Sequence, residues 1–300
     1  MAKIAYADRR FRKALLPLVT EMNAIIDDYM AQGYRLTVRQ MFYQLVTKNT
    51  IENSETSYKR ISSIINDARL GGYMDWDAIE DRTRAFLRRQ RWTSGSHMLE
   101  SARDSFHMDL WKGQPLRPFF VVEKEALAGV LERVCSKWDV PILPARGYPS
   151  VTVLRDFVIE DVNPCLNAEP QQDVKIFHMG DHDPSGLDMT RDLRERVDIF
   201  TTHTVDVERV ALTMKQIQEQ KPPPNMAKST DKRFKEYCRK YKTDKSWELD
   251  ALSPRYLSEL VDQHVAPLID QKIWDERLKE IEFLRSRLTA SMLEAKEGKW

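Results

Sequence analysis

The first third of the chain carries hydrophobic residues at helical spacing. This pattern predicts helices over residues 11–30 and 38–47 and a third from about 54 to 69. Glycines follow the first and third of these segments, and Thr37 is a suitable N-cap for the second. Residues 73–84 predict a small hairpin or wing, residues 93–97 a loop and residues 98–115 a further helix. Three helices and a wing predict a winged-helix module, whose last helix commonly enters a DNA groove.

The rest of the chain alternates between apolar runs and helical patterns. The expected strands are 118–122, 140–143, 174–179 and 204–212, and the expected helices are 126–137, 151–159, 187–196 and two within 254–296. Strands that are almost continuously apolar are typical of a parallel sheet covered on both faces. The sequence therefore predicts an α/β fold with an N-terminal helical domain over residues 1–110. A parallel-sheet domain with C-terminal helices packed on it would follow over residues 111–300.

Composition excludes several classes of protein. The 300 residues are 42% hydrophobic, which supports a sizeable core and two domains. No apolar run is long enough for a signal peptide or a membrane span. The three cysteines form no CxxC pair, so a disulfide scaffold or cysteine zinc site is not expected. We expect a cytoplasmic, nucleoid-associated protein without a membrane segment.

Charge is distributed unevenly along the chain. Residues 1–110 hold 17 basic and 14 acidic side chains, residues 111–220 hold 13 and 18, and residues 221–300 hold 17 and 14. An acidic centre between basic flanks is compatible with a metal-binding core and polyanion-binding arms, although chance produces such a pattern as well.

Acidic residues follow two of the predicted strands. Glu123 comes directly after the first strand, and Asp181 and Asp183 follow the third. In an open parallel sheet, ligands bind at the carboxyl ends of the strands, and neighbouring carboxylates repel unless a proton or a cation lies between them. Oxygen ligands favour Mg²⁺ or Mn²⁺, so we expect these three residues to bind one of these ions. The alternative is a surface turn, because Asp-x-Asp-Pro-Ser-Gly also suits a turn.

These segments resemble a known family. Val121-Val122-Glu123-Lys124, Gly147-Tyr148-Pro149 and the segment from Gly180 to Gly186 resemble the Toprim domain of the topoisomerase VI A subunit and of the meiotic double-strand-break transesterase. The resemblance implies that Glu123, Asp181 and Asp183 bind Mg²⁺. It covers most of residues 35–260. Because the chain is short, it looks most like the stand-alone "mini-A" members.

The same family carries a nucleophilic tyrosine on its winged-helix domain. Residues 38–43 resemble that motif, so Tyr43 takes the place of the nucleophile and Arg39 accompanies it. Helical spacing puts Tyr43 on the side of its helix that faces away from the domain core, four residues after Arg39. Without the resemblance, an exposed or interface tyrosine is the simpler interpretation.

Two further segments suit DNA contact. The third helix has donors away from its apolar stripe, and we expect them to bind nucleic acid: Lys59, Arg60, Asn66 and Arg69. A solvated charged face is the alternative. Residues 221–245, basic and interleaved with aromatic residues, fit either a nucleic-acid-binding arm or a solvated insertion. His182 is interpreted as a spacer.

Three functions stay open at this stage. The leading hypothesis is a DNA-cleaving transesterase, in which Tyr43 attacks a backbone phosphate with help from Arg39 and a Glu123-bound ion. The alternatives are a Toprim nuclease that uses water as its nucleophile and a non-catalytic DNA-binding subunit. The resemblance implies double-stranded DNA as substrate and a homodimer in which Tyr43 works with the partner's metal site. Topoisomerase VI depends on a separate ATPase subunit, whereas the stand-alone members have no evident ATPase partner, so such a subunit stays an open alternative here. The chain itself lacks the common glycine-rich ATP motifs.

Overall fold

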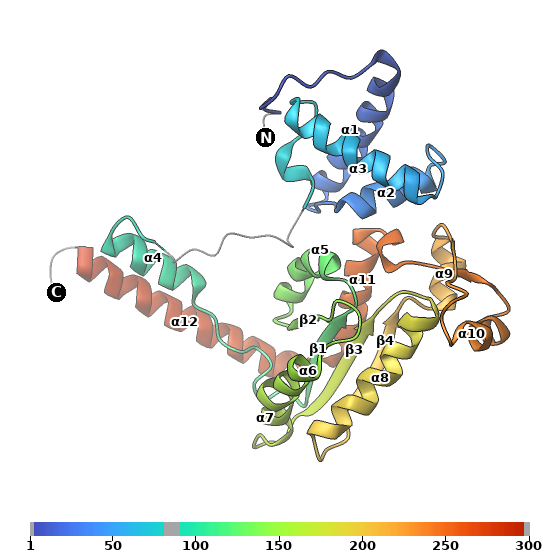
Figure 1. Ribbon diagram of the computed structural model, residues 1–300. Helices are drawn as coiled ribbons and strands as arrows, with labels where there is room; N and C mark the ends of the chain where they lie inside the picture. The colour runs from blue at the N-terminus through green and yellow to red at the C-terminus, as the bar shows by residue number, and fades with distance from the viewer. Residues whose placement is uncertain (1–2, 81–90, 297–300) are drawn as a thin grey trace.

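The protein is an α/β protein built on a four-stranded parallel sheet, as the sequence predicts. The computed structural model describes residues 3–80 and 91–296. Figure 1 shows the N-terminal helices beyond one end of the sheet, and a two-helix arm that extends from the sheet domain.

The three predicted N-terminal helices are confirmed. They are α1 (Leu16–Ala31), α2 (Val38–Thr47) and α3 (Glu55–Leu70). Thr37 and Gln40 form a reciprocal capping box at the start of α2, and Ser54 caps α3, which explains where these helices begin. Their apolar stripes meet in a common core around Met22, Met41 and Ile61.

The predicted wing is wrong for the residues that the structure describes. Residues 73–80 contain a short 3₁₀ helix, η2 (Trp76–Ala78), and a single parallel bridge that joins Ile79 to Leu36. Residues 81–84 lie outside the described residues. The loop predicted over 93–97 is instead the start of α4 (Gly95–Ser105), because the Ser94 side chain caps that helix.

The sheet has the strand order β2-β1-β3-β4, and every pair in it is parallel. The strands are β1 (Leu116–Val122), β2 (Ile142–Pro144), β3 (Asp173–Met179) and β4 (Asp206–Ala211). The two central strands are in register from Leu116 opposite Asp173 to Val122 opposite Met179. Their carboxyl ends therefore meet at one edge of the sheet.

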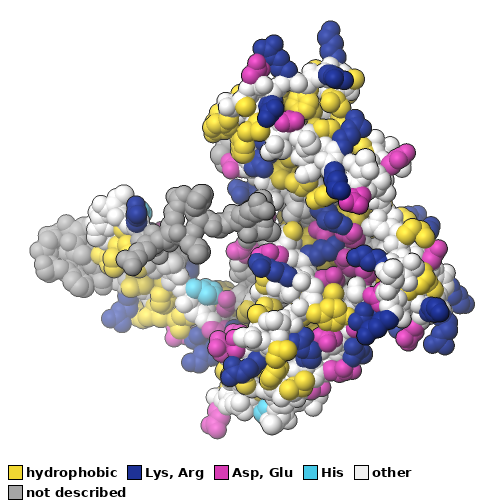
Figure 2. Space-filling model, in the orientation of Figure 1, with side chains coloured by type: hydrophobic (Ala, Val, Ile, Leu, Met, Phe, Trp, Pro, Cys, Tyr) yellow, Lys and Arg dark blue, Asp and Glu magenta, His cyan; other side chains and the backbone are white. Residues whose placement is uncertain are grey.

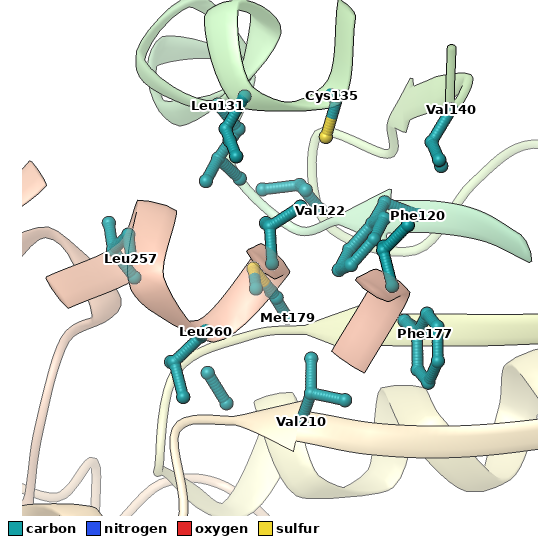
Figure 3. Close-up of a cluster of buried hydrophobic side chains, with 14 of the residues drawn as sticks. Phe120, Val122, Leu131, Cys135, Val140, Phe177, Met179, Val210, Leu257 and Leu260 are labelled. Carbon is teal, nitrogen blue, oxygen red and sulfur yellow. The ribbon is translucent and has the colours of Figure 1, made fainter. Parts of the chain in front are cut away.

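Both faces of the sheet are buried, which explains the continuous apolar strands. On one face, Phe120, Phe177 and Val210 pack under α5 (Glu125–Lys137) and α11 (Pro254–Val265) (Figure 3). On the other face, Phe119 and Ile176 pack under α6 (Val151–Phe157) and α8 (Pro184–Phe200).

The remaining elements are η1 (Lys13–Leu15), the π-helical turn η3 (Val158–Val162), α7 (Asn163–Leu166), α9 (Met214–Gln220), β5 (Asn225–Met226), α10 (Phe234–Tyr241), β6 (Lys245–Ser246), η4 (Leu249–Ala251), η5 (Ala266–Leu268) and α12 (Gln271–Lys296).

The C-terminal helices behave differently from each other. α11 packs on the sheet domain as predicted, whereas α12 contributes Trp274 and Ile281 to that core and then runs along α4 (Figure 1). The predicted division at residue 110 groups α4 with the N-terminal domain, but α4 packs against α12. Among the described helices, none combines the length and the hydropathy needed to cross a membrane.

The basic segment 221–245 is anchored to the sheet domain. It contains α10 and the two-residue strands β5 and β6, which pair in an antiparallel manner. His182, predicted as a spacer, is 1% exposed, and it exchanges backbone hydrogen bonds with Trp247. The His182 ring contacts Tyr241 and lies 3.0 Å from the Tyr237 hydroxyl, and burial lowers the His182 pKa to about 4. His182 therefore fixes the insertion on the sheet.

Candidate active site

The carboxyl edge of the sheet brings Glu123 and Asp181 into direct contact. β1 and β3 are neighbours in the sheet, and Glu123 Oε2 accepts a hydrogen bond of 2.8 Å from the backbone amide of Asp181. A Cβ at Gly180 would lie 2.8 Å from the same carboxylate oxygen, so a side chain there would force the Glu123 side chain to shift. Glycine at this position thus allows the close approach.

Arg209 on β4 holds the acidic loop in place. Its guanidinium donates hydrogen bonds to the carbonyl oxygens of Gly180 and Asp181 at 2.7 and 2.6 Å, and to that of Gly186 at 2.8 Å. Burial lowers the pKa of Arg209 to about 10, so the side chain still carries its charge at neutral pH. Sequence analysis missed this residue because Arg209 stands within an ordinary strand pattern.

Asp183 is the N-cap of α8. Its Oδ1 accepts hydrogen bonds from the Gly186 amide at 2.6 Å and from the Ser185 hydroxyl at 2.9 Å. The positive end of this helix therefore already has an aspartate carboxylate as its anion.

Lys124 is the centre of a buried charge cluster. Its ammonium nitrogen lies 2.7 Å from Asp250, 2.9 Å from Glu248 and 3.0 Å from Asp181. Burial opposes its charge, but these carboxylates raise the Lys124 pKa overall. Glu248 and Asp250 were not predicted. Asp250 lies in η4 and Glu248 directly before it, far along the chain from Asp181, so no strand pattern in the sequence connects them to the acidic edge.

Glu248 joins the acidic edge to the tyrosine helix. It accepts hydrogen bonds from Arg39 Nε at 2.6 Å and from Nη2 of the same guanidinium. It also accepts a hydrogen bond from the Lys124 ammonium. Burial alone would raise its pKa, but Lys124 and Arg39 together lower the Glu248 pKa to about 2. Arg39, which was predicted to act beside Tyr43, therefore also forms an ion pair that links α2 to the sheet domain.

Tyr43 is buried, contrary to the expected outward position. Only 2% of it is exposed, because residues of the C-terminal half, including Asn225 and η4, cover the side of α2 that the helical spacing left open. The Tyr43 hydroxyl accepts a hydrogen bond of 3.1 Å from Asn225. Burial and the charge of Glu248 raise its pKa to about 12, although Asn225, Arg39 and Lys124 oppose the shift.

One cavity of about 460 Å³ brings four of the predicted site residues together, Arg39, Tyr43, Asp181 and Asp183, and Glu248 lines it as well, all from the same chain. Glu123 and the predicted nucleic-acid residues of α3 are not among the described residues that line it. Figure 2 shows acidic and basic side chains gathered in the hollow between the N-terminal helices and the sheet domain. The resemblance implied that Tyr43 would meet the acids of a partner; here a single chain already places them in one cavity.

The predicted metal ligands do not converge in this structure. Across residues 3–80 and 91–296, no three acidic, histidine or cysteine side chains are grouped so that they could hold a metal ion. Asp183 caps α8, Asp181 accepts from the Leu249 amide and contacts Lys124, and Glu123 accepts from the Asp181 amide. Lysine ammonium and backbone amides thus satisfy the carboxylates that the sequence assigns to Mg²⁺.

The electrostatics of Glu123 and Asp181 would nevertheless suit a bound cation. Burial and the neighbouring Glu123 raise the pKa of Asp181 to about 7, and burial and Asp183 raise that of Glu123. These oxygen ligands are the type that hard divalent ions prefer. A divalent ion would supply the positive charge that the cluster lacks.

The predicted nucleic-acid residues lie on α3. Lys59, Arg60 and Asn66 are exposed, and Lys59 pairs with Glu55. Arg69 instead donates to the carbonyl of Trp76 at 2.9 Å and stacks on its ring, which ties it to the N-terminal domain. DNA contact by these residues stays a prediction.

Comparisons with protein-family models, curated proteins and solved structures found no match to this chain.

Replacing Asp181 by Asn should stabilise the protein in metal-free buffer above neutral pH. The folded-state pKa of about 7 lies above the unfolded value, so ionisation of Asp181 opposes folding, increasingly as the pH rises from about 4 to 7. Compared with wild type, Asp181→Asn should gain on the order of 1 kcal/mol between pH 5 and pH 8, or about 2–4 °C in Tm. Thermal unfolding followed by circular dichroism measures this gain. A difference between Asp181→Asn and wild type that is the same at every pH would contradict the assignment.

Proposed function

We propose that the protein is a DNA-cleaving transesterase in which Tyr43 is the nucleophile. The observation that carries the proposal is the shared cavity, where the Tyr43 hydroxyl, the Arg39 guanidinium and the carboxylates of Asp181 and Asp183 meet. The resemblance of the same residues to the topoisomerase VI A family supports the same reaction. Glu55 and Tyr58 at the start of α3 line the cavity, and Lys59 and Arg60 of the same helix are exposed, which suits contact with double-stranded DNA.

The proposed reaction exchanges one phosphate ester for another. The Tyr43 oxygen bonds to a backbone phosphorus as the bond from that phosphorus to the 3′ oxygen breaks. The phenol loses a proton and the 3′ oxygen gains one, which leaves a 5′-phosphotyrosyl link and a free 3′-hydroxyl. Because the ester is conserved, the step needs no ATP and can reverse.

The other residues have distinct roles in this proposal. Arg39 neutralises charge next to the phenol, its ring-facing guanidinium lying 5.8 Å from the centre of the Tyr43 ring. The family resemblance assigns the divalent ion to Glu123, Asp181 and Asp183, which would have to exchange some of their present hydrogen bonds in order to converge on it. When bound, that ion would stabilise the charge that develops on the phosphate. A homodimer, a separate ATPase subunit and a nucleoid location are part of the proposal through the family resemblance alone.

One observation favours the nuclease alternative. A phenol with a pKa of about 12 is almost fully protonated at pH 7, so an ion-activated water is a competing nucleophile. The two mechanisms differ in whether protein remains attached to the cleaved DNA.

Tyr43→Phe should abolish covalent attachment to DNA and leave DNA affinity within about threefold, because only a hydroxyl is lost. The measurement is a shift of end-labelled DNA in denaturing gels after incubation with Mg²⁺ or Mn²⁺. Tyr58→Phe is the matched control, since Tyr58 lines the same cavity and stacks under Arg39. Cleavage by Tyr43→Phe at the wild-type rate would instead establish the nuclease mechanism.

Mn²⁺ should bind wild-type protein in a calorimetric titration, and Asp181→Asn should weaken that binding by at least about tenfold, because it removes a charged oxygen ligand. Asp206→Asn, which changes an exposed carboxylate on the same sheet, should bind as wild type does. Heat no greater than dilution for wild type would rule out the metal assignment.

A mixture of Tyr43→Phe and Asp181→Asn should remain inactive. The cavity joins the tyrosine and the acids of one chain, so each variant lacks one half of every site. Two affinity tags on co-expressed chains would show whether subunits associate, and plasmid nicking measures activity. Recovery of nicking by a verified mixed dimer would show that Tyr43 works with the partner's acids.

A further inference from the structure

Asn225 stands at the meeting point of the two domains. It begins β5, follows three consecutive prolines and pairs with Ser246 of β6, so its backbone is well fixed. The residue belongs to the basic segment 221–245, which the sequence offered as an arm for nucleic acid or as a solvated insertion. Its side chain instead lines the cavity that contains Tyr43.

Neighbouring groups set the orientation of the Asn225 amide. The Asn53 amide nitrogen donates to the Pro224 carbonyl and to Asn225 Oδ1, each at 2.8 Å. Asn225 Nδ2 then donates to Tyr43 Oη at 3.1 Å and to Glu248 Oε1 at 3.3 Å. Since a carboxylate can only accept and Asn53 donates to the oxygen side, this arrangement defines which end of the Asn225 amide faces the tyrosine.

The donor is directed at the atom that would react. A hydrogen bond to the phenolic oxygen becomes charge-assisted, and therefore stronger, as that oxygen loses its proton. Arg39 and Lys124 also favour the ionised oxygen, whereas Glu248 and burial oppose it. Asn225 is thus an uncharged donor. It can stabilise the ionised Tyr43 oxygen, but it has no charge that would attract the DNA phosphate away from that oxygen.

We propose that Asn225 is a catalytic residue, whose amide holds Tyr43 Oη in place and stabilises the negative charge that develops there during attack. This inference rests on the proposed function. It also gives the segment around β5 a chemical role, because Glu248 and Asn53 hold that segment against the tyrosine helix.

The test compares covalent attachment with DNA affinity. In single-turnover reactions, Asn225→Ala should slow attachment by about 100-fold, the scale for loss of one oriented donor. Its Kd for the same DNA should stay within about threefold of wild type, since the amide is directed at protein groups. Asn225→Asp keeps the shape but places a carboxylate beside the phenolic oxygen, so it should be at least as slow.

Asn167→Ala is the matched control, because Asn167 also bonds another side chain, His203, but lies on the far side of the sheet domain after α7. Circular dichroism spectra verify the fold of each variant. Attachment within twofold of wild type for Asn225→Ala or Asn225→Asp would overturn the inference while the proposed function stands. A loss of DNA affinity as large as the loss of rate would also overturn it. No Tyr43-dependent adduct with wild type would overturn both proposals.

Discussion

The shared contact of the Lys124 ammonium with three carboxylates is the interaction on which the site depends. Parallel strands deliver acidic residues to one edge of the sheet, and burial there disfavours their charge. Lys124 lies within 3.0 Å of Asp181, Glu248 and Asp250, and Arg39 completes the neutralisation of Glu248 from the other domain. Without these two cations, the N-terminal helices would have to pack against an uncompensated negative surface.

Sequence reasoning located the part of the site that follows from strand geometry. Glu123 and Asp181 could be predicted together because residues that follow neighbouring parallel strands must share an edge. Glu248 and Asp250 could not be found in this way, since they follow no strand of the four-stranded sheet and the chain returns to the edge through residues 221–248. Arg209 was missed for a related reason. Its position fits the strand pattern of β4, and its role follows only from the hydrogen bonds that it donates to the carbonyl oxygens of Gly180 and Asp181.

The helical pattern also explains why the outward position predicted for Tyr43 is wrong. Periodicity describes the side of α2 that faces its own domain, and it gave Tyr43 an outward position. The outward side is covered by η4 and Asn225, contacts between residues about 180–200 positions apart that local spacing cannot encode. The same limit applies to the wing, where residues 73–80 are held by a bridge to Leu36 and form no hairpin.

Charge balance links the binding of DNA to that of a cation in the proposed reaction. The edge and its surroundings hold five carboxylates, Glu123, Asp181, Asp183, Glu248 and Asp250, and three cations, Arg39, Lys124 and Arg209. A phosphodiester that enters the cavity adds a negative charge and competes with Glu248 for Arg39. A divalent ion on the acids would compensate the phosphate and would oppose the burial and the repulsion from Glu123 that raise the pKa of Asp181 to about 7. It would also favour ionisation of the Tyr43 phenol, which burial and Glu248 oppose and which Asn225, Arg39 and Lys124 favour.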